Sequence, residues 1–439
     1  MKKVVKFGGS SLASAEQFKK VGDIIRADKS RRYVVPSAPG KRSSSDTKVT
    51  DMLYSCYNLA IREKKFTSLL DEIHARYNEI IDGLNLELSL DHEFDMIREN
   101  FGKKIGRDYA ASRGEYLNGI IMANYLGFCF IDAAEVIRFH EDGSLDDEKT
   151  NELLSLRLEG EEFAVILGFY GAKEDGTIVT FSRGGSDITG SLVARAALAD
   201  LYENWTDVSG FLIADPRIVT NPKSIETITY RELRELSYMG ATVLHEDAIF
   251  PVRKVGIPIN IRNTNAPQDK GTLIVESTCR QPKYTITGIA GTDGFAAVTI
   301  EKAMMNSEIG FCRKVLEEFD KNGISIEHMP SGIDTMTIFV HKDEFEEKEQ
   351  QVLAGIHKAV NPDHIELESD LALIAIVGRG MRSTRGTAGR IFSALAHAHI
   401  NVKMIDQGSS ELNIIVGVRH DDFKNAIRAL YQIFVETQI

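Results

Sequence analysis

Apolar and polar positions follow two different rhythms over residues 1 to about 280. Short β-branched or apolar runs alternate with amphipathic stretches of helical period, such as 14–27, 112–126 and 186–200. This order predicts an α/β fold, in which helices cover both faces of a mostly parallel sheet. The expected strands are 4–7, 33–38, 128–133, 163–169, 177–181, 203–210 and 257–261.

Residues 58–111 interrupt this alternation, because they are long, charged and helical by period. We interpret them as a helical insertion within the first domain; a lid or simple packing would both explain such an insertion. Polar residues around Pro282 interrupt any periodicity and predict a linker. The first domain is therefore expected to span 1–283.

The remaining third of the chain contains an internal repeat. An offset of 76 positions aligns Val298 with Ile374 and Gly310 with Gly386, together with many other apolar positions and without gaps. A glycine, a helical apolar period and an alternating strand recur in the same order. The pattern predicts two copies of one small α+β unit, which indicates binding or assembly rather than chemistry.

Two glycine-rich segments carry the candidate chemistry, KFGGSS at 6–11 and FSRGGSDITG at 181–190. Each follows an apolar run and leads into a helical pattern. Paired glycines at such a turn bring backbone N–H groups to an anion, and the helix N-terminus adds its positive dipole end. Gly8, Gly9 and Ser10 are the expected donors of the first turn.

Charged residues beside these turns indicate phosphoryl transfer, which needs positioning and charge neutralisation. Lys6 would place an ammonium over the phosphate, or it is a structural lysine at a strand end. Arg183 suits an acidic acceptor, because its planar fork matches a carboxylate. Asp187 would cap its helix, or hold Lys6 or a metal. Glu115, expected in a first helical turn, would complement the dipole or pair with a substrate ammonium.

Two later segments, WTDVSG at 205–210 and ADPR at 214–217, contribute further polar residues after a strand. Such turns are frequent in any protein. Their position downstream of the second glycine turn favours a role in nucleotide binding.

Composition narrows the class of protein. A formal net charge of −12 argues against nucleic acid as the main partner. No apolar run approaches the roughly 20 residues of a membrane span, and the N-terminus lacks the features of a signal peptide. The four cysteines are scattered, so we expect reduced, packed thiols in a cytoplasmic protein.

Taken together, these segments resemble those of the aspartokinases, within the amino-acid kinase superfamily, over essentially the whole chain. KFGGSS is similar to the family's KFGGTS, SRGE at 112–115 to its glycine-glutamate segment, and FSRGGSD to its LGRGGSD. WTDVSG and ADPR are similar to its nucleotide-binding segments. The repeat resembles its two ACT domains, of which the first is inserted into the second.

The resemblance implies an activity: ATP-dependent phosphorylation of the β-carboxylate of L-aspartate to 4-phospho-L-aspartate. This is the first step of the lysine, threonine and methionine branch of biosynthesis. It implies that Arg183 binds the α-carboxylate and Glu115 the ammonium, while Ser37 and Thr50 line the acceptor pocket. Lys6 would neutralise developing charge and Asp187 would organise it.

The resemblance also implies a nucleotide site and excludes a resident cofactor. Magnesium would be carried by ATP rather than held by protein ligands. The residues expected against Mg-ATP are Lys6, Gly8, Gly9, Ser10, Thr206, Asp207, Asp215 and Arg217.

For the repeat, the resemblance implies a first ACT domain at 301–366, inserted into a second formed by 284–300 and 367–439. These would form a homodimer, with association of dimers left open, and bind lysine as feedback inhibitor, with threonine as the alternative. Ser325 and Glu327 alternate on one predicted strand face, where a carboxylate suits a cationic side chain. The full set of expected effector-binding residues is Met305, Ser307, Ser325, Glu327 and Ser331.

Two segments depart from the family, and one of them is the loop SAPGKRSSSD at 37–46, which is longer and more basic than the common SAMG form. The common GAKVLHP, whose lysine reaches the ATP phosphates, reads GATVLHE here, with Thr242 and Glu246. Either another cation, Arg217 or Lys254, replaces that lysine, or ATP is held differently. Two other readings stay open: another amino-acid kinase, such as an acylglutamate or glutamate kinase, and a catalytically inactive sensor. The ACT-like copies oppose the first, and the charged glycine turns oppose the second.

Overall fold

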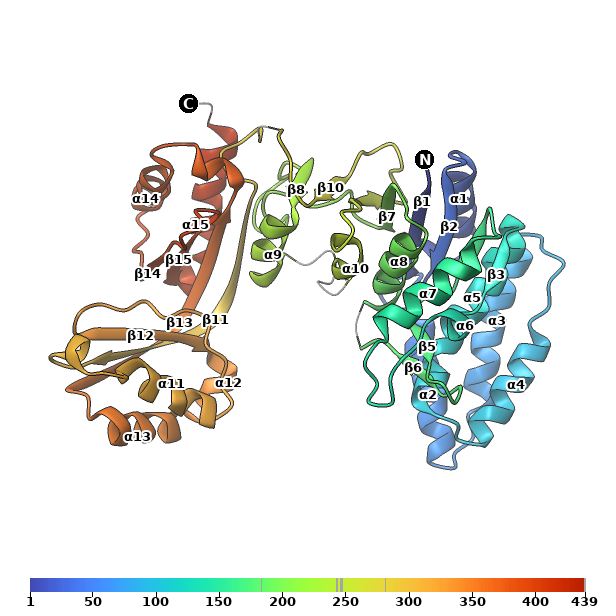
Figure 1. The fold of residues 1–439 in the computed structure, drawn as a ribbon, viewed down its shortest axis with the longest axis horizontal. Helices are drawn as coiled ribbons and strands as arrows, with labels where there is room; N and C mark the ends of the chain where they lie inside the picture. The colour runs from blue at the N-terminus through green and yellow to red at the C-terminus, as the bar shows by residue number, and fades with distance from the viewer. Residues whose placement is uncertain (183, 242–243, 245–247, 281, 438–439) are drawn as a thin grey trace. The chain divides into compact units, whose positions relative to one another are not determined.

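The computed structural model describes the chain except residues 183, 242–243, 245–247, 281 and 438–439. The chain divides into two compact units (Figure 1). The N-terminal unit comprises 1–211, 226–230 and 243–278, and the C-terminal unit comprises 212–225, 231–242 and 279–439. The expectations for Arg183, Thr242 and Glu246 lie outside the described residues.

The N-terminal unit is built on one sheet, so the α/β prediction is confirmed. Its described strands run in the order β3-β4-β2-β1-β7-β9-β10-β8, and every neighbouring pair is parallel except β9 with β10. A separate hairpin joins β5 to β6. The strands are β1 (Lys3–Phe7), β2 (Arg31–Pro36), β3 (Cys129–Ile131), β4 (Ala164–Ile166), β5 (Tyr170–Ala172), β6 (Ile178–Thr180), β7 (Leu201–Thr206), β8 (Thr227–Thr229), β9 (Ile259–Asn263) and β10 (Thr272–Val275).

All the strands expected from the sequence are present in this sheet or hairpin, although their ends differ. The strand expected at 203–210 ends at Thr206, because the backbone bends at Asp207, Val208 and Gly210. The short strands β5 and β8 were not expected from the sequence.

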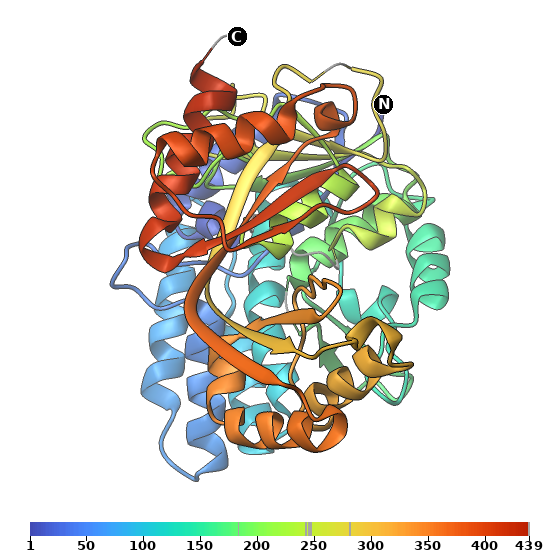
Figure 2. The same ribbon diagram turned by 90° about the vertical axis from the view of Figure 1, so that its left-hand side faces the viewer.

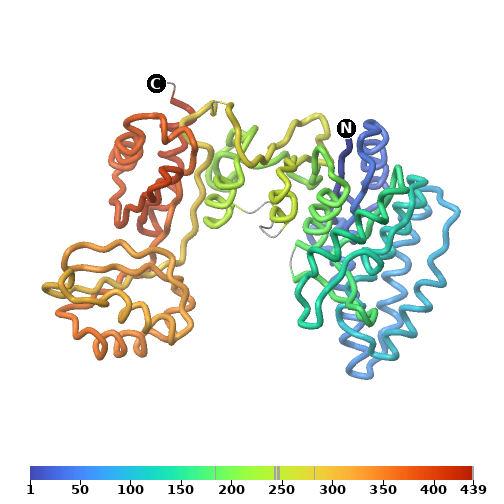
Figure 3. The backbone as a smooth tube through the Cα atoms, viewed as in Figure 1, coloured from blue at the N-terminus to red at the C-terminus, as the bar shows by residue number. Residues whose placement is uncertain are grey.

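The N-terminal unit includes a group of helices that lie side by side (Figure 3). Their side chains contribute much of its apolar core. The interruption expected at 58–111 is helical, but the helices cross both of its proposed ends. The helices are α1 (Ala15–Arg26), α2 (Val49–Ile61), α3 (Thr67–Gly83), α4 (Asp91–Gly102), α5 (Arg107–Leu126), α6 (Ala133–Val136), α7 (Asp147–Leu158), α8 (Gly185–Ala196) and α10 (Phe250–Arg253), with a 3-10 turn η1 (Gly9–Leu12).

A buried carboxylate joins the central strands. Glu203 on β7 is 0% exposed and accepts hydrogen bonds from Arg31 Nε on β2, at 2.8 Å, and from Trp205 Nε1, at 2.9 Å. Lys3 Nζ on β1 lies 3.1 Å from the same carboxylate. Burial alone would raise the pKa of Glu203, but Arg31 and Lys3 outweigh it and lower that pKa. Glu203 therefore stays ionised and fixes β1, β2 and β7 together.

The loops that follow β1 and β2 touch through two glycines. A Cβ atom on Gly9 would lie 2.8 Å from the carbonyl oxygen of Ala38, and one on Gly40 would lie 2.5 Å from the carbonyl carbon of Gly9. The Gly40 amide donates to the Gly9 carbonyl at 2.8 Å. Only residues without side chains allow this backbone approach. The loop after β2 is therefore held beside the first glycine turn.

The C-terminal unit contains a second sheet, of order β12-β11-β13-β15-β14 among the described residues (Figure 2). Its neighbouring strands are antiparallel. Its elements are α9 (Tyr230–Tyr238, whose first residue belongs to the N-terminal unit), β11 (Gly288–Glu301), η3 (Met305–Ser307), α11 (Phe311–Lys321), β12 (Thr335–His341), α12 (Lys342–Glu346), α13 (Glu349–Val360), β13 (His364–Val377), η4 (Arg379–Arg382), α14 (Thr387–His397), β14 (Met404–Asp406), β15 (Asn413–Arg419), η5 (His420–Asp422), α15 (Phe423–Tyr431) and a π-helical turn η6 (Gln432–Glu436).

The internal repeat expected from the sequence is confirmed by these elements. An offset of 76 positions superposes β11 on β13 and α11 on α14 end to end. Both helices begin after a glycine with positive φ, 78° at Gly310 and 81° at Gly386. The later half of β11 pairs with the earlier half of β13, and the earlier half of β11 with the later half of β13. Each long strand thus contributes to both halves of the sheet.

Helix α9 packs with the C-terminal unit although it precedes the boundary expected near residue 283. Its Glu232 is 0% exposed and accepts from Arg379 Nη1 at 2.9 Å and from the hydroxyl of Thr287 at 2.5 Å. Its Glu235 accepts from Asn413 Nδ2 at 2.6 Å. These contacts tie α9 to the second copy of the repeat.

Two further expectations concern membranes and cysteines. Within the described residues, no helix combines the length and apolar character that a bilayer crossing requires. Cys56 is buried, but Cys279 and Cys312 are exposed, so the expectation of packed thiols is wrong for those two. Cys279 lies between β10 and β11, and Cys312 lies in the first turn of α11.

The glycine contact generates a test of the fold. We expect Gly9→Ala to lower the free energy of unfolding by about 1–3 kcal/mol, because the added methyl group would overlap the Ala38 carbonyl. Gly8→Ala is the matched control, since a Cβ there would lie at an ordinary 3.6 Å from its neighbours. Denaturant unfolding of both variants measures the difference. Equal stabilities would contradict the assigned contact.

Candidate active site

The two glycine turns are joined by an ion pair. Lys6 Nζ, near the end of β1, lies 2.5 Å from Asp187 Oδ1 in the first turn of α8. Asn204 Nδ2 on β7 donates to the same oxygen at 2.8 Å. Asp187 therefore holds Lys6, and the interpretation of Asp187 as a helix cap is wrong: the N-cap of α8 is Gly184, with φ of 59°. Lys6 and Asn204 lie toward the carboxyl ends of parallel strands, where ligands bind in open α/β sheets.

The first glycine turn is less open to an anion than the sequence suggested. The Gly8 amide donates to the Trp205 carbonyl at 2.9 Å, so it is not a free donor. Ser10 is exposed, whereas the neighbouring Ser11 is buried, with its hydroxyl 2.7 Å from that of Thr264. A glycine is required at position 9 because its backbone contacts the loop after β2. Ser10 and the ammonium of Lys6 remain candidates for the contact with phosphate that is expected of this turn.

Glu115 lies in the interior of α5, so the expectation of a first-turn glutamate is wrong. The helix already begins at Arg107, because residues 107–113 continue its period after Gly106. Glu115 is 5% exposed and its Oε1 accepts from the Ala38 amide at 3.1 Å. Burial raises its pKa to about 8, against the lowering effects of the Ala38 amide and of the charge on Lys6. Its Oε2 is buried without a hydrogen-bond partner.

The other two acceptor-site candidates lie beside Glu115. Ser37 directly follows β2, and its amide donates to the Phe7 carbonyl at 3.0 Å. Thr50 lies in the first turn of α2, and its hydroxyl would be 3.7 Å from a Cβ atom on Gly114. The structure therefore brings Glu115, Ser37 and Thr50 to one place, where α5, α2 and the loop after β2 meet.

The expected nucleotide residues fall into both units. Thr206 ends β7, and its hydroxyl donates to Asp207 Oδ1 at 3.2 Å. Asp215 and Arg217 belong to the C-terminal unit, where Arg217 Nη2 donates to Asp215 Oδ2 at 2.6 Å. That contact lowers the pKa of Asp215.

The two cations considered as replacements for the family lysine both have carboxylate partners. Arg217 pairs with Asp215, as described above. Lys254 Nζ lies 2.8 Å from Asp147 Oδ2, which also binds Arg195 near the C-terminal end of α8. Asp187 is at the opposite end of that helix, about 12 Å away at the rise of an α-helix. Lys254 is thus remote from the Lys6–Asp187 pair.

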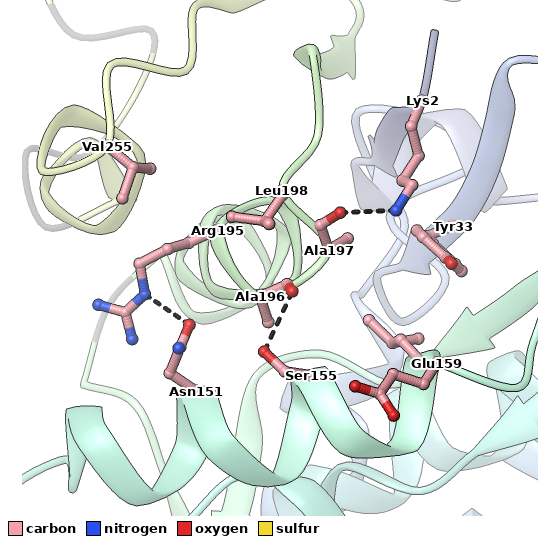
Figure 4. A pocket seen from close by; sticks show the side chains of 11 residues that line it. Lys2, Tyr33, Asn151, Ser155, Glu159, Arg195, Ala196, Ala197, Leu198 and Val255 are labelled. Carbon is pink, nitrogen blue, oxygen red and sulfur yellow. Dashed lines mark hydrogen bonds between the residues drawn. The ribbon is translucent and has the colours of Figure 1, made fainter.

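A cavity of about 370 Å³ also lies at the C-terminal end of α8 (Figure 4). Lys2, Tyr33, Asn151, Ser155 and Arg195 contribute polar side chains to its wall. These groups are bonded locally: Arg195 Nε donates to Asn151 Oδ1 at 2.9 Å, and Lys2 Nζ donates to a main-chain carbonyl at 2.8 Å. The cavity is separate from the candidate active site.

The expected effector residues do not share one environment. Met305 is buried in the core of the first repeat copy, whereas Ser307, Ser325 and Ser331 are exposed. The strand expected to carry Ser325 and Glu327 is absent among the described elements; the segment instead forms isolated bridges with β12. Pro330 lacks an amide hydrogen and interrupts the pairing there.

The Glu327 carboxylate has two partners within the C-terminal unit. The side chain of Glu327 is 8% exposed. It accepts a hydrogen bond from the hydroxyl of Tyr238, the last residue of α9, and lies 3.5 Å from His341 Nε2. Burial and this contact with Glu327 raise the pKa of Tyr238 to about 12.

Two functional candidates were missed from the sequence. Asn204 holds Asp187, and Asn118, one turn after Glu115, donates from Nδ2 to the Ser37 carbonyl at 2.6 Å. Both are almost fully buried. A polar residue at an apolar position of a strand or helix was the available signal. Within the described residues, no cluster of His, Cys, Asp and Glu side chains could hold a metal ion.

Comparisons with known proteins place these observations in a family. Residues 1–263 match the amino acid kinase family, and residues 374–434 match an ACT domain. The chain is 40% identical to aspartokinase 3 of Bacillus subtilis, over 98% of each chain. It resembles the crystal structure of aspartate kinase from Clostridium acetobutylicum at 50% identity, with a TM-score of 0.91 and coverage of 99% and 100%.

A second solved structure is that of E. coli aspartokinase III in complex with lysine and aspartate, in its T-state. It is 25% identical, with a TM-score of 0.74 and coverage of 99% of each chain. The extent of these matches, over both the kinase and the ACT regions, shows that the chain belongs to the aspartokinase family of amino acid kinases.

Proposed function

We propose that this chain transfers the γ-phosphoryl group of Mg-ATP to the β-carboxylate of L-aspartate, giving 4-phospho-L-aspartate. The observation that carries the proposal is the Lys6–Asp187 ion pair between the two glycine turns. Asp187 holds the Lys6 ammonium in place, and this ammonium stabilises the negative charge on the phosphoryl group during transfer. No general base is needed, because the β-carboxylate is ionised at neutral pH.

The acceptor is recognised by Glu115, Ser37 and Thr50, together with Arg183, which lies outside the described residues. A buried carboxyl with one free oxygen suits the ammonium of an α-amino acid. An acylated acceptor, such as an acylglutamate, carries no ammonium and would leave Glu115 without a partner. This difference favours a free amino acid over the acylglutamate alternative.

The nucleotide is proposed to bind against Lys6, Gly9, Ser10, Thr206 and Asp207, with its magnesium carried by ATP. Asp215 and Arg217 stay candidates on the family resemblance. We place the enzyme in the cytoplasm, at the start of the lysine, threonine and methionine branch. The alternative of a catalytically inactive sensor is opposed by the Lys6–Asp187 pair, because a sensor would not need a positioned ammonium between the two glycine turns.

We further propose that the repeat is a pair of ACT domains, 301–366 inserted into 284–300 and 367–439, that form a homodimer and bind lysine as inhibitor. Support comes from the two-fold repeat and from the lysine complex of the E. coli relative. In this proposal Glu327 binds the side-chain ammonium of lysine. Tyr238 and His341 contact the same carboxylate, so lysine would compete with them for it.

The role of Lys6 is tested by substitution. We expect Lys6→Ala to lower kcat by about 10²–10³-fold, the usual effect of removing one group that stabilises transition-state charge. Acyl phosphate formed from aspartate and ATP is trapped with hydroxylamine and quantified. Lys20→Ala, which removes a half-exposed lysine of α1, is the control and should retain full activity. Undiminished turnover in Lys6→Ala would overturn the assignment.

The raised pKa of Glu115 predicts coupling between aspartate binding and proton release. With a pKa of about 8 the free carboxyl is mostly protonated at pH 7, whereas the substrate ammonium requires the ionised form. The Kd for aspartate should therefore fall by up to tenfold per pH unit between pH 6 and 8, then level off. Calorimetry in buffers of different ionisation enthalpy should report release of about one proton at pH 7.

Glu115→Gln is the control for this coupling, because it removes the titrating group at constant size. We expect it to weaken aspartate binding and to abolish both the proton release and the pH dependence below pH 8. A Kd that is flat from pH 6 to 8 in the unmodified chain would show that the Glu115 carboxyl does not meet the ammonium.

The effector assignment predicts opposite effects for two neighbours. Glu327→Ala should raise the lysine concentration for half-inhibition by about tenfold or more, because a charge-assisted hydrogen bond is lost. Tyr238→Phe should lower that concentration, since it removes a donor that competes for the carboxylate. Tyr284→Phe, at a half-buried tyrosine between β10 and β11 in the same unit, serves as the control. Inhibition that is unchanged in Glu327→Ala would remove Glu327 from the effector site.

A further inference from the structure

Two side chains of helix α5 form hydrogen bonds with one peptide group, the one between Ser37 and Ala38. Glu115 and Asn118 are three residues apart and therefore share one face of the helix. Glu115 Oε1 accepts from the Ala38 amide at 3.1 Å, and Asn118 Nδ2 donates to the Ser37 carbonyl at 2.6 Å. That amide and that carbonyl belong to the same peptide unit. Both of its polar groups are thus satisfied by α5.

Each of the two side chains has a second oxygen that is left over. Glu115 Oε2 and Asn118 Oδ1 are both buried and have no hydrogen-bond partner. Glu115 is 5% exposed and Asn118 is 0% exposed. An unmatched buried acceptor is costly, so two of them on one helix face require an explanation. A ligand that donates more than one hydrogen bond would satisfy both.

The surroundings restrict what that ligand can be. Gly114 lets α5 approach the loop so closely that a Cβ atom there would lie 2.9 Å from Ala38 Cβ. Tyr77 donates its hydroxyl to the Gly114 carbonyl at 2.7 Å, so that carbonyl is already used. Once the Glu115 carboxyl is ionised, as binding of an ammonium requires, the free groups of this helix face are acceptors only. A primary ammonium, with three donors and a positive charge, is the complementary group.

Resting on the function proposed above, we propose that Asn118 is a second recognition residue for the substrate's α-ammonium and positions Ser37 in the acceptor pocket. Its Oδ1 accepts from the ammonium beside Glu115, and its Nδ2 holds the peptide group after Ser37. Asn118 thus selects amino acids over acids of the same length that lack the amino group.

The test compares L-aspartate with succinate, which is the same dicarboxylate without the amino group. Dissociation constants for both are measured by calorimetry in the presence of a non-hydrolysable ATP analogue. Asn118→Leu keeps the side-chain volume and removes both polar atoms. We expect it to weaken aspartate binding about tenfold or more beyond any change for succinate, so the preference for aspartate falls.

Two further variants separate the two roles of Asn118. Asn118→Asp keeps an acceptor oxygen but cannot donate to Ser37, so we expect it to weaken both ligands while retaining the preference for aspartate. Asn124→Ala, at an exposed asparagine on the same helix, should change neither constant. Affinity for the ATP analogue reports whether each variant remains folded.

The outcomes distinguish this proposal from the function on which it rests. If the ratio of the two dissociation constants is unchanged in Asn118→Leu, the role of Asn118 is overturned but the proposed function is not. A purely structural asparagine would change the affinity for both ligands equally. Failure of the unmodified chain to phosphorylate aspartate would overturn the proposed function and the role of Asn118 together. The proposal is supported if the Kd for succinate divided by the Kd for aspartate falls in Asn118→Leu and is restored in Asn118→Asp.

Discussion

The 2.5 Å ion pair between Lys6 and Asp187 is the contact on which the candidate active site depends. It joins the end of β1 to the start of α8, and Asn204 on β7, the neighbour of β1 in the sheet, fixes the carboxylate. A lysine ammonium on a four-carbon stem has many conformations, so a fixed partner is what gives it a defined position. Through this pair, whose members are 181 positions apart in sequence, the two turns become one site.

The loop after β2, which carries the acceptor-site residue Ser37, is positioned by backbone contacts and hydrogen bonds rather than by an ion pair in the site. Gly9 and Gly40 bring two loops into backbone contact, and α5 then holds the Ser37–Ala38 peptide group from the other side. Backbone contacts and buried side chains fix this loop, and among them the buried Arg76 donates to the Gly40 carbonyl. Such an arrangement is rigid before substrate arrives, which reduces the ordering cost of binding.

Much of this was accessible from the sequence. The alternation of short apolar runs predicted the sheet, and the offset of 76 positions predicted the repeat to the residue. Other features depend on distance in space. Gly114 suggests a helix start just before Glu115, but the helix already begins at Arg107. The glycine pair suggests a free Gly8 amide, but that amide donates to the Trp205 carbonyl, which is distant in sequence. Asn118 and Asn204 carry no motif, and only their burial and contacts identify them.

The central claim, that Lys6 and Asp187 act as one unit in phosphoryl transfer, is tested most directly by a double-mutant cycle. kcat/KM for aspartate is measured for the unmodified chain, Lys6→Ala, Asp187→Asn and the double variant. If Asp187 works by holding Lys6, the double variant should be no worse than Lys6→Ala alone. Losses that multiply in the double variant would show that the two residues act independently and would contradict the account.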